Sequence, residues 1–369
     1  MKVGLVCDWY HPRVGGIELH LQDLAKQLAG AGHDVVVVTP TPGPDDVDGI
    51  RVRRTPGALM PVFEFLCTGA GIRAVGNALT EEKVDVAHCH VSIVSPAALG
   101  GACQAHRRGI PTVLTFHSVV PQTHLLARAV RMTLGTAAWR ARFTAVSKRV
   151  AGDVSPIAAG SAVTVLPNGI DVGFWRVERT RTDSEFRMVS VMRLNGKKRP
   201  LALVDMMKRL RSMLPADERV SLRIVGDGPQ RPMVQRAIER ANLGDRVELL
   251  GRKTREEIRE LLREADVFVL PTVRESFGLA ALEARCVGLP VVAMAQSGVS
   301  ELITHRREGL LARSDQELAA HVLTLVREHD LRRGIAANNR TTSPAHDWPN
   351  VIEQHLSLYG EAIALRATV

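Results

Sequence analysis

Residues 267–283 read VFVLPTVRESFGLAALE, a short apolar run followed by a turn and then by apolar residues at helical spacing. The run Val267–Leu270 predicts a buried strand, because it is short, rich in β-branched and aromatic residues, and bounded by Pro271. The segment Gly278–Val287 predicts a helix. In open sheets built from alternating strands and helices, ligands bind beyond the carboxyl ends of the strands. Glu275, which lies between this strand and this helix, is therefore a candidate ligand-binding residue.

The same alternation of strand and helix continues through the C-terminal half of the chain. The predicted strands are Arg187–Met192, Val220–Val225, Val247–Leu250, Val267–Leu270 and Val291–Ala293. The predicted helices are Pro200–Met213, Pro229–Ala241, Arg255–Arg263 and Gly278–Val287. Strands and helices that alternate at this rhythm indicate a parallel sheet with helices on both faces.

The N-terminal half of the chain repeats this architecture. Its predicted strands are Val3–Cys7, Val35–Thr39, Val84–His88 and Thr112–Phe116. Its predicted helices are Ile17–Ala29, Val62–Leu79 and Ser95–Arg107. The polar stretch Arg176–Glu185 separates the two halves. The sequence thus predicts an α/β protein of two doubly wound domains, and a length of 369 residues fits two domains.

Composition and cysteine usage are those of a soluble protein from a reducing compartment. Hydrophobic residues make up 45% of the chain and charged residues 24%. The opening MKVGLVCDWY is too short an apolar run for a signal peptide, and no run approaches the roughly 20 apolar residues that span a bilayer. The five cysteines show no CxxC spacing, so we expect reduced thiols and a cytoplasmic protein. They are Cys7, Cys67, Cys89, Cys103 and Cys286.

The formal net charge is +9, and the charge is unevenly distributed. The stretch Val86–Gly152 contains no Asp or Glu, although it holds eight Lys and Arg residues: Arg107, Arg108, Arg128, Arg131, Arg140, Arg142, Lys148 and Arg149. Such a segment creates a positive potential on one domain. It is either a solubilising surface or a face for an anionic membrane or a phosphorylated acceptor. Nucleic acid is not expected as a partner, because aromatic residues that could stack on bases make up only 4% of the chain.

Three further segments have the residue types that bind phosphate. Gly15 and Gly16 follow the first predicted strand at the start of a helix, where the backbone can approach an anion, although a purely structural turn would look the same. Arg193 and Lys198 follow the strand Arg187–Met192. Two cations beside a helix start suit a diphosphate, and a solvated turn is the alternative. The turn after Glu275 offers the free backbone N–H groups of Phe277, Gly278 and Leu279.

These segments resemble the motifs of retaining glycosyltransferases of the GT-B fold, in particular glycosyltransferase family 4. Glu275 and Glu283 match the Glu-x7-Glu motif of that family. Further motifs match in order and spacing: Gly15-Gly16, Arg193 with Lys198, Val225-Gly226-Asp227-Gly228-Pro229, Pro167-Asn168-Gly169-Ile170-Asp171 and Gly288-Leu289-Pro290-Val291-Val292-Ala293. Within the family, the opening loop and the Pro-Asn-Gly turn look closest to phosphatidylinositol mannosyltransferases and N-acetylglucosaminyltransferases.

The resemblance implies the GT-B arrangement, two Rossmann-like domains that face a central cleft. The expected bounds are 1–176 for the acceptor-side domain, 177–345 for the nucleotide-sugar-binding domain, and 346–369 for a C-terminal helix that crosses back to the first domain. The implied activity is transfer of a hexosyl unit from a nucleotide diphosphate sugar, with retention of anomeric configuration. The acceptor hydroxyl would belong to a glycolipid, a polysaccharide precursor or a small molecule. A sugar-nucleotide epimerase of the same fold is the alternative.

The resemblance also implies roles for individual residues. Arg193 and Lys198 would clamp the diphosphate, Glu275 would bind the sugar hydroxyls, and Glu283 would hold the ribose. Gly226 and the amides of Phe277, Gly278 and Leu279 would line the donor site, and Gly15 and Gly16 would close over the phosphate. His117 would face the reacting sugar. Two residues depart from the family: Arg199 stands where glycine is common, and Ser118 stands where aspartate is often found, which leaves the acceptor side in doubt.

Acceptor binding is assigned to Asp8, His11 and His90, which follow or end strands of the N-terminal half. The alternative for His90 is a structural histidine whose hydrogen bonds are all made within the protein. The stretch His124–Arg142 is apolar and arginine-rich, which suits either an ordinary domain helix or reversible docking on the inner face of the cell membrane, where a lipid-linked acceptor would lie.

No metal and no cofactor besides the donor are expected. Asp46-Val47-Asp48 spells the DxD motif of metal-dependent transferases, but it lies in a Pro-Gly-rich turn, Thr41–Gly49. His88-Cys89-His90 places two histidines on one face of a strand without a carboxylate, which is too few ligands for a metal site.

Overall fold

A computed structural model describes residues 1–13, 15–57, 59–60, 65–66, 68–92, 95–118, 139–158, 160–178, 185–215 and 217–367 of the chain. These residues form two compact units. The first unit comprises Met1–Gly169 together with Trp348–Val369, and the second comprises Ile170–Asp347. The first boundary therefore lies at Gly169 and not after residue 176. The reason is local pairing, since the Ile170 N–H donates to the His346 carbonyl at 2.9 Å within the second unit.

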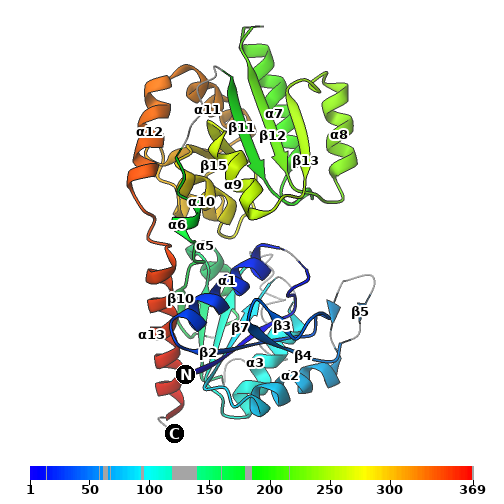
Figure 1. The fold of residues 1–369 in the computed structure, drawn as a ribbon, viewed down its shortest axis with the longest axis vertical. Coiled ribbons are helices and arrows are strands. Elements are labelled where there is room, and N and C mark those ends of the chain that lie inside the picture. Colours follow the sequence, from blue (N-terminus) through cyan, green and yellow to red (C-terminus); the bar gives the residue numbers. More distant parts are fainter. Residues whose placement is uncertain are drawn as a thin grey trace. The chain divides into compact units, whose positions relative to one another are not determined.

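The first unit is built on an eight-stranded sheet with the order β10-β9-β8-β7-β1-β2-β4-β3 (Figure 1). Its strands are β1 Lys2–Cys7, β2 Asp34–Thr39, β3 Asp46–Val47, β4 Ile50–Arg54, β7 Val86–Val91, β8 Thr112–Phe116, β9 Ala141–Ala145 and β10 Val163–Val165. All neighbours pair in parallel except β3 and β4. A separate two-stranded sheet joins β5, Leu59–Met60, to β6, Phe65–Leu66.

The described residues of the first unit form five helices: α1 Gly16–Gly30, α2 Gly69–Glu81, α3 Pro96–Arg107, α5 Lys148–Val154 and α13 Trp348–Ala367. The predicted helix Val62–Leu79 was wrong at its start. Helix α2 begins at Gly69, because the Thr68 hydroxyl caps it by accepting the Gly71 N–H at 2.9 Å. The predicted strand Val84–His88 was also displaced, because β7 continues to Val91. His90 therefore lies within a strand.

The second unit has a six-stranded parallel sheet with the order β13-β12-β11-β14-β15-β16. The strands are β11 Phe186–Val191, β12 Val220–Val225, β13 Val247–Gly251, β14 Val267–Leu270, β15 Val291–Met294 and β16 Gly309–Ala312. Counted within this unit, the order is 3-2-1-4-5-6, as in dinucleotide-binding folds. The direction in which strands are added reverses between β11 and β14, and the predicted doubly wound architecture is confirmed.

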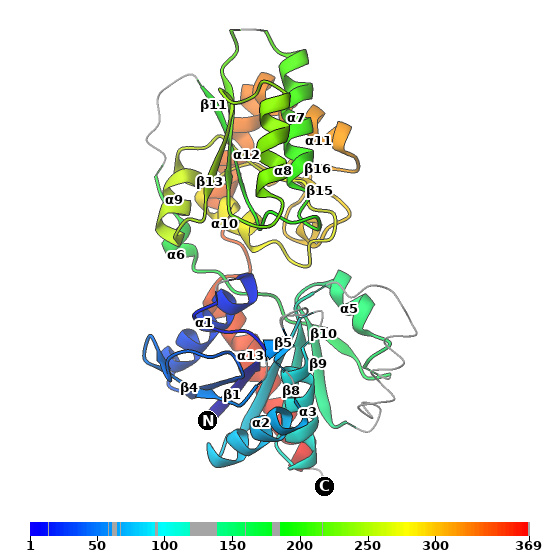
Figure 2. The same cartoon turned by 90° about the vertical axis from the view of Figure 1, so that its right-hand side faces the viewer.

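Seven α-helices and one 3-10 helix occur in the part of the second unit that the structure describes. They are α6 Val172–Trp175, α7 Pro200–Met213, α8 Arg231–Arg240, α9 Arg255–Arg263, α10 Leu279–Val287, α11 Asp315–Arg327, α12 His329–Thr341 and the 3-10 helix η2 Gly298–Glu301. Helices α7 and α8 lie side by side over the sheet (Figure 2). Thr254 and Glu257 form a reciprocal capping box that fixes the start of α9. Helices therefore cover a sheet whose central strands β14 and β15 are fully buried.

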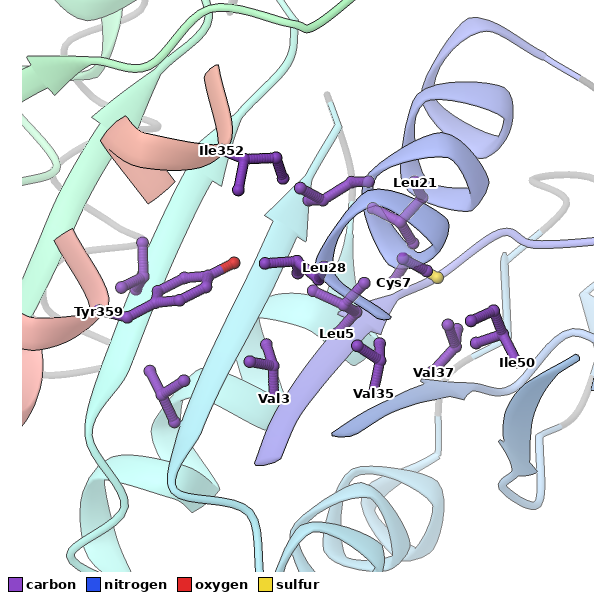
Figure 3. Packing of buried hydrophobic residues seen from close by; sticks show 14 of the residues in the cluster. Val3, Leu5, Cys7, Leu21, Leu28, Val35, Val37, Ile50, Ile352 and Tyr359 are labelled. Carbon is purple, nitrogen blue, oxygen red and sulfur yellow. The ribbon is translucent and has the colours of Figure 1, made fainter. Parts of the chain in front are cut away.

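Helix α13 supplies part of the core of the first unit although it is last in the chain. Trp348, Val351 and Tyr359 are almost fully buried and share one apolar cluster with Leu5 of β1. Figure 3 shows Ile352 and Tyr359 of this helix in the same cluster as Val3 and Leu5 of β1. Burying a large apolar side chain contributes about 1.5–3 kcal/mol, so this face stabilises the unit substantially.

A chain of hydrogen bonds ties the Tyr359 hydroxyl of α13 to three strands. The hydroxyl lies 2.8 Å from His88 Nδ1, and His88 Nε2 lies 2.6 Å from Thr115 Oγ1. Thr115 Oγ1 lies 2.6 Å from Thr144 Oγ1, whose hydroxyl donates to the Leu114 carbonyl at 3.1 Å. The Thr144 hydroxyl has one proton and donates it to that carbonyl, so it can only accept a hydrogen bond from Thr115. The same argument then determines the donor and the acceptor of each remaining hydrogen bond in the chain. Tyr359 therefore donates to His88, which donates to Thr115, which donates to Thr144.

We predict that Tyr359→Phe destabilises the first unit by about 1–3 kcal/mol, because it leaves the buried His88 Nδ1 without a donor. The other tyrosine of the chain is a matched control. Tyr10 is also fully buried, but its hydroxyl has no partner in the described part of the chain. Tyr10→Phe should therefore leave stability unchanged or raise it slightly. Thermal unfolding of the two variants tests this, and equal melting temperatures for both would contradict the proposed direction of the chain.

Candidate active site

Two loops of the second unit lie at the point where its strand order reverses. One follows β11 and carries Arg193 and Lys198, and the other follows β14 and carries Glu275. Their parent strands are hydrogen-bonded neighbours. Ligands of open parallel sheets bind at such reversal points, because the following helices leave on opposite faces of the sheet. The loops therefore bring together residues that are distant in sequence.

Lys198 and Glu275 are in direct contact. Lys198 Nζ lies 2.5 Å from Glu275 Oε2, and their side chains are 30% and 13% exposed. The backbone of the lysine is held from two sides. Its N–H donates to Asn195 Oδ1 at 3.1 Å, and its carbonyl accepts the Thr272 hydroxyl at 3.3 Å. Two predicted site residues thus form one ion pair, within reach of solvent and of a ligand.

Arg193 is exposed, and its guanidinium has no partner within the described residues of the chain. Its loop is positioned by the glycine turn after β12. Leu194 donates its N–H to the Asp227 carbonyl at 2.9 Å, and a β-carbon at Gly226 would lie 1.9 Å from the Met192 carbonyl oxygen. Gly226 has φ +125°, which also favours glycine. The predicted residue Gly226 therefore shapes the loop that presents Arg193.

The turn before α10 leaves backbone donors available. Gly278 is its N-cap, with φ +96°. The amides of Phe277, Gly278 and Leu279 donate to no backbone carbonyl within the part of the chain that the structure describes. A hydrogen bond from the loop after β15 holds the turn in place, since the Gly298 N–H donates to the Glu275 carbonyl at 2.9 Å. Glu283 lies half-buried just over one turn into α10. This helix start can receive an anion beside Lys198.

Arg199, which stands where glycine is common in the resembling family, has a left-handed backbone at φ +57° and is the N-cap of α7. Its guanidinium compensates for the absence of glycine. It donates to the Pro271 carbonyl at 2.9 Å and to Asp315 Oδ2 at 2.6 Å. The arginine thus ties the Lys198 loop to the end of β14, a role that no pattern in the sequence indicates.

In the first unit, Gly15 and Gly16 stand at the start of α1 as predicted. Gly15 is the extended N-cap, and Gly16 is exposed with open space around its α-carbon. The carboxylate of Glu18 folds back over this helix start, so that a β-carbon on Gly15 would lie 2.5 Å from Glu18 Oε2. Arg13 Nε lies 3.4 Å from Glu18 Oε1. The chain therefore places a carboxylate of its own at this helix start, a role for Glu18 that sequence reasoning missed.

The three predicted acceptor residues lie in different surroundings. The carboxylate of Asp8 is buried and accepts the N–H groups of Ala97 at 2.8 Å and Ala98 at 3.1 Å, so it caps α3. Burial raises the pKa of Asp8 to about 6. His11 is half-buried, and its Nδ1 has no partner within the described residues. His90 is fully buried and lies 2.9 Å, Nδ1 to Nε2, from His117. Their acceptor roles remain predictions.

Comparison with known proteins agrees with this fold. The structure of HepE from Anabaena in complex with UDP-glucose superposes with a TM-score of 0.78 at 22% identity, covering 98% of this chain and 100% of that one. A glycosyltransferase from Rickettsia africae gives a TM-score of 0.79 at 16% identity, with 98% of each chain covered. The family model for glycosyltransferase family 4 matches residues 14–174, and that for glycosyl transferases group 1 matches residues 171–342.

The chain is a GT-B glycosyltransferase. Among curated relatives, a GDP-mannose-dependent alpha-mannosyltransferase of Mycobacterium tuberculosis is 29% identical, over 100% of this chain and 98% of the relative. A phosphatidylinositol N-acetylglucosaminyltransferase GPI3 subunit of Saccharomyces cerevisiae is 26% identical, over 97% of this chain and 82% of the relative. The resemblance to glycosyltransferase family 4 is confirmed.

In this glycosyltransferase, the carboxylates of the DxD sequence are engaged elsewhere. Asp46 Oδ1 accepts the Gly49 N–H at 3.1 Å, and Asp48 pairs with Lys26 at 2.7 Å. Among the described residues, no group of three or more His, Cys, Asp or Glu side chains is arranged to hold a metal ion. The four described cysteines are buried and unpaired.

The predicted membrane segment of the glycosyltransferase, His124–Arg142, lies outside the described residues up to position 138, including Arg128 and Arg131. Of its remaining residues, Trp139 is buried and Arg142 Nε lies 3.3 Å from Glu361 Oε2. No helix among the described residues is long and apolar enough to cross a membrane.

Five histidines of the glycosyltransferase are buried together in the first unit: His20, His88, His90, His117 and His355. The rings of His88 and His90 have centroids 4.0 Å apart, and His20 stacks on Trp348 at 5.5 Å. Burial lowers the pKa of every one of them, that of His117 to about 3 and that of His355 to about 4. The cluster is therefore uncharged at neutral pH.

We predict that the first unit loses stability as the pH falls below about 6.5. Unfolded histidines bind protons below about 6.5, whereas the folded cluster stays neutral, so unfolding takes up protons. The stability is fully present above that pH. Each proton taken up lowers the free energy of unfolding by about 1.4 kcal/mol per pH unit. Burial raises the folded pKa of Asp8 to about 6, above its ordinary value of 3.8. Between these two values the folded state holds one proton that the unfolded state does not, so Asp8 partly offsets the loss of stability caused by the histidines.

Melting temperatures measured at pH 7.5 and pH 5.5 in one buffer series test this prediction. The transition of the first unit should move markedly downward at the lower pH. A melting temperature that is constant over this interval would show that the cluster is not neutral and buried as described.

Proposed function

We propose that this chain transfers a hexosyl unit from a nucleotide diphosphate sugar to an acceptor hydroxyl, with retention of anomeric configuration. The second unit binds the donor, and the first unit binds the acceptor. The observation that carries the proposal is the contact between Lys198 and Glu275 at the reversal point of the second sheet. It joins a cation suited to phosphate and a carboxylate suited to sugar hydroxyls in one ligand-accessible place.

The donor diphosphate would be held by cations and amides. Arg193 and Lys198 supply positive charge, and the amides of Phe277, Gly278 and Leu279 face an anion at the start of α10. HepE, which has the same fold, was crystallised with UDP-glucose, and the mycobacterial relative is named for GDP-mannose. These names support a nucleotide diphosphate sugar as donor, with the base and the sugar left open.

Glu275 and Glu283 would bind the hydroxyl groups of the donor. The Glu275 carboxylate forms an ion pair with Lys198. A bound diphosphate would give Lys198 a second anionic partner. The Glu275 carboxylate would then be available to accept hydrogen bonds from sugar hydroxyls. Glu283, further along α10, is assigned to the ribose. This division of roles explains why two carboxylates occur in a site that binds an anion.

In the chemical step, the acceptor oxygen forms a bond to the anomeric carbon as the bond from that carbon to the phosphate oxygen breaks. The departing diphosphate takes the electron pair and accepts the proton of the acceptor hydroxyl on the same face. Lys198 and Arg193 stabilise the negative charge that develops on the leaving group. Preorganised charges of this kind typically contribute about 100- to 1000-fold to the rate.

The acceptor we propose is a lipid-linked or anionic molecule at the inner face of the cell membrane, which would make the protein cytoplasmic and peripheral to the membrane. Two observations support this. The yeast relative is named for phosphatidylinositol, and the acid-free stretch Val86–Gly152 gives the first unit a basic character. Sedimentation with vesicles tests it: binding should rise with anionic lipid and fall with salt. Failure to bind any vesicle would favour a soluble acceptor.

We predict that Lys198→Ala and Glu275→Ala each lower turnover at least about 100-fold. The neighbouring Lys197 is a matched control, because it has the same charge and is exposed in the same loop. Turnover can be measured as release of UDP or GDP from UDP-glucose or GDP-mannose, and binding of free UDP or GDP by calorimetry. Lys197→Ala should retain more than half of the activity.

Rates near that of the wild type in both Lys198→Ala and Glu275→Ala would refute the donor-site assignment. Complete consumption of the donor without an acceptor, with an epimeric nucleotide sugar as product, would instead identify an epimerase.

A second prediction concerns metal ions. We expect product formation to continue in excess chelator, because the phosphates are served by Arg193, Lys198 and helix amides, and the DxD carboxylates are engaged by Gly49 and Lys26. The measurement is the rate with and without a chelator at saturating donor. Loss of activity that magnesium or manganese restores would contradict this expectation.

A further inference from the structure

His90 and His117 form a hydrogen-bonded pair at the carboxyl end of the first sheet. His90 lies in β7, and His117 follows the last residue of β8. His90 Nδ1 and His117 Nε2 are 2.9 Å apart, and the rings are stacked with centroids 5.2 Å apart. The His117 N–H also donates to the Val91 carbonyl at 2.8 Å. Both the backbone and the ring of His117 are therefore fixed by strand β7.

The second ring nitrogen of His90 decides which residue donates in this pair. His90 Nε2 is buried and has no hydrogen-bond partner within the described residues. A buried N–H without an acceptor is more costly than a buried lone pair without a donor, and orphaned buried N–H groups are rare. The proton of neutral His90 therefore resides on Nδ1. His90 donates, and His117 Nε2 accepts.

This assignment determines the chemistry that His117 presents. A neutral imidazole carries one proton, so His117 whose Nε2 accepts must carry its proton on Nδ1. Burial lowers the pKa of both histidines, which keeps them neutral at physiological pH. The other ring nitrogen of His117, Nδ1, has no hydrogen-bond partner within the described residues and is consequently an N–H donor and not an acceptor.

We propose that His90 is a positioning residue that holds His117 in the Nδ1–H tautomer, so that His117 donates a hydrogen bond to a substrate oxygen at the carboxyl end of the first sheet. The inference rests on the proposed function only in taking that oxygen to belong to a sugar or to the acceptor. An imidazole held as a donor stabilises negative charge on such an oxygen and cannot remove a proton from it. His117 is therefore not the base of the reaction.

His88, two residues before His90 on the same strand, differs from His90 in its hydrogen bonds. Both ring nitrogens of His88 are occupied, by Tyr359 and by Thr115. Its hydrogen-bond chain is closed at the Leu114 carbonyl. The chain of His90 instead passes to His117 and leaves one nitrogen of that residue for a ligand. Replacement of His88 should therefore alter stability, and replacement of His90 should alter the tautomer of His117.

Nitrogen-15 NMR of the full chain, labelled at the histidine rings, measures the tautomer directly. The signals of His117 are assigned by their loss in His117→Gln. We expect its Nδ1 to have the shift of a protonated nitrogen and its Nε2 that of an unprotonated one. The reverse pattern, or averaged shifts, in the wild-type protein would overturn the proposal.

Two variants of His90 test the positioning role. His90→Leu removes the donor, so the His117 shifts should lose this pattern, and kcat should fall at least about tenfold while KM for the donor changes less. His90→Asn places a side-chain N–H near the position of Nδ1 and should recover both the pattern and most of the lost kcat. His117 shifts that are unchanged in His90→Leu would overturn the proposal, as would equal kcat in His90→Leu and His90→Asn.

Failure of the proposed function is distinguishable from failure of this inference. If UDP and GDP do not bind and no transfer occurs in the wild-type protein, the proposed function fails. The nitrogen shifts of His117 in the wild-type protein and in His90→Asn then still support or overturn the positioning role. If transfer occurs and His117→Gln keeps the wild-type kcat, the donated hydrogen bond to substrate is overturned.

Discussion

The order of the parallel strands is the constraint on which the site depends. In the second unit, β11 has β12 on one side and β14 on the other. Right-handed connections then place the helices that follow β11 and β14 on opposite faces of the sheet. The loops that lead into these two helices therefore diverge and leave a crevice at the carboxyl ends of the two strands. The first unit repeats this arrangement around β1, which lies between β2 and β7. The glycine loop of α1 follows β1, His90 lies near the carboxyl end of β7, and His117 follows the neighbouring strand β8. In both units the candidate site thus lies where the strand order of the sheet reverses.

Sequence reasoning predicted the elements whose pattern is local. The strand Val267–Leu270 and the helices beginning at Pro200 and Arg255 lie where the apolar spacing indicated. Lys198 and Glu275 were predicted as one site because both follow strands, and the sheet brings them into contact. Helix α2 was placed too early, because helical spacing before Gly69 competes with a capping threonine and a short strand pair that the pattern does not reveal.

Features that depend on distant parts of the chain could not be predicted. The partner of His88 is Tyr359, 271 residues away. Nothing in the sequence near His90 indicates that its ring meets that of His117. Arg199 has a left-handed backbone, and its guanidinium binds Pro271 and Asp315, which are distant in sequence, so both contacts form only in the folded unit. Local pattern therefore gives the frame of the site, and tertiary contacts give the orientation of its side chains.

Because α13 belongs to the first unit, that unit is assembled from two separate parts of the chain, with the whole second unit between them. A ribosome releases Ile170–Asp347 before it releases Trp348. Domains generally fold as units during synthesis. The second unit can therefore reach its native structure first. Until α13 has been synthesised, the histidines and the apolar surface that this helix covers in the N-terminal sheet stay exposed to solvent. The order of synthesis thus makes the first unit the more exposed to aggregation and to chaperones in the cell.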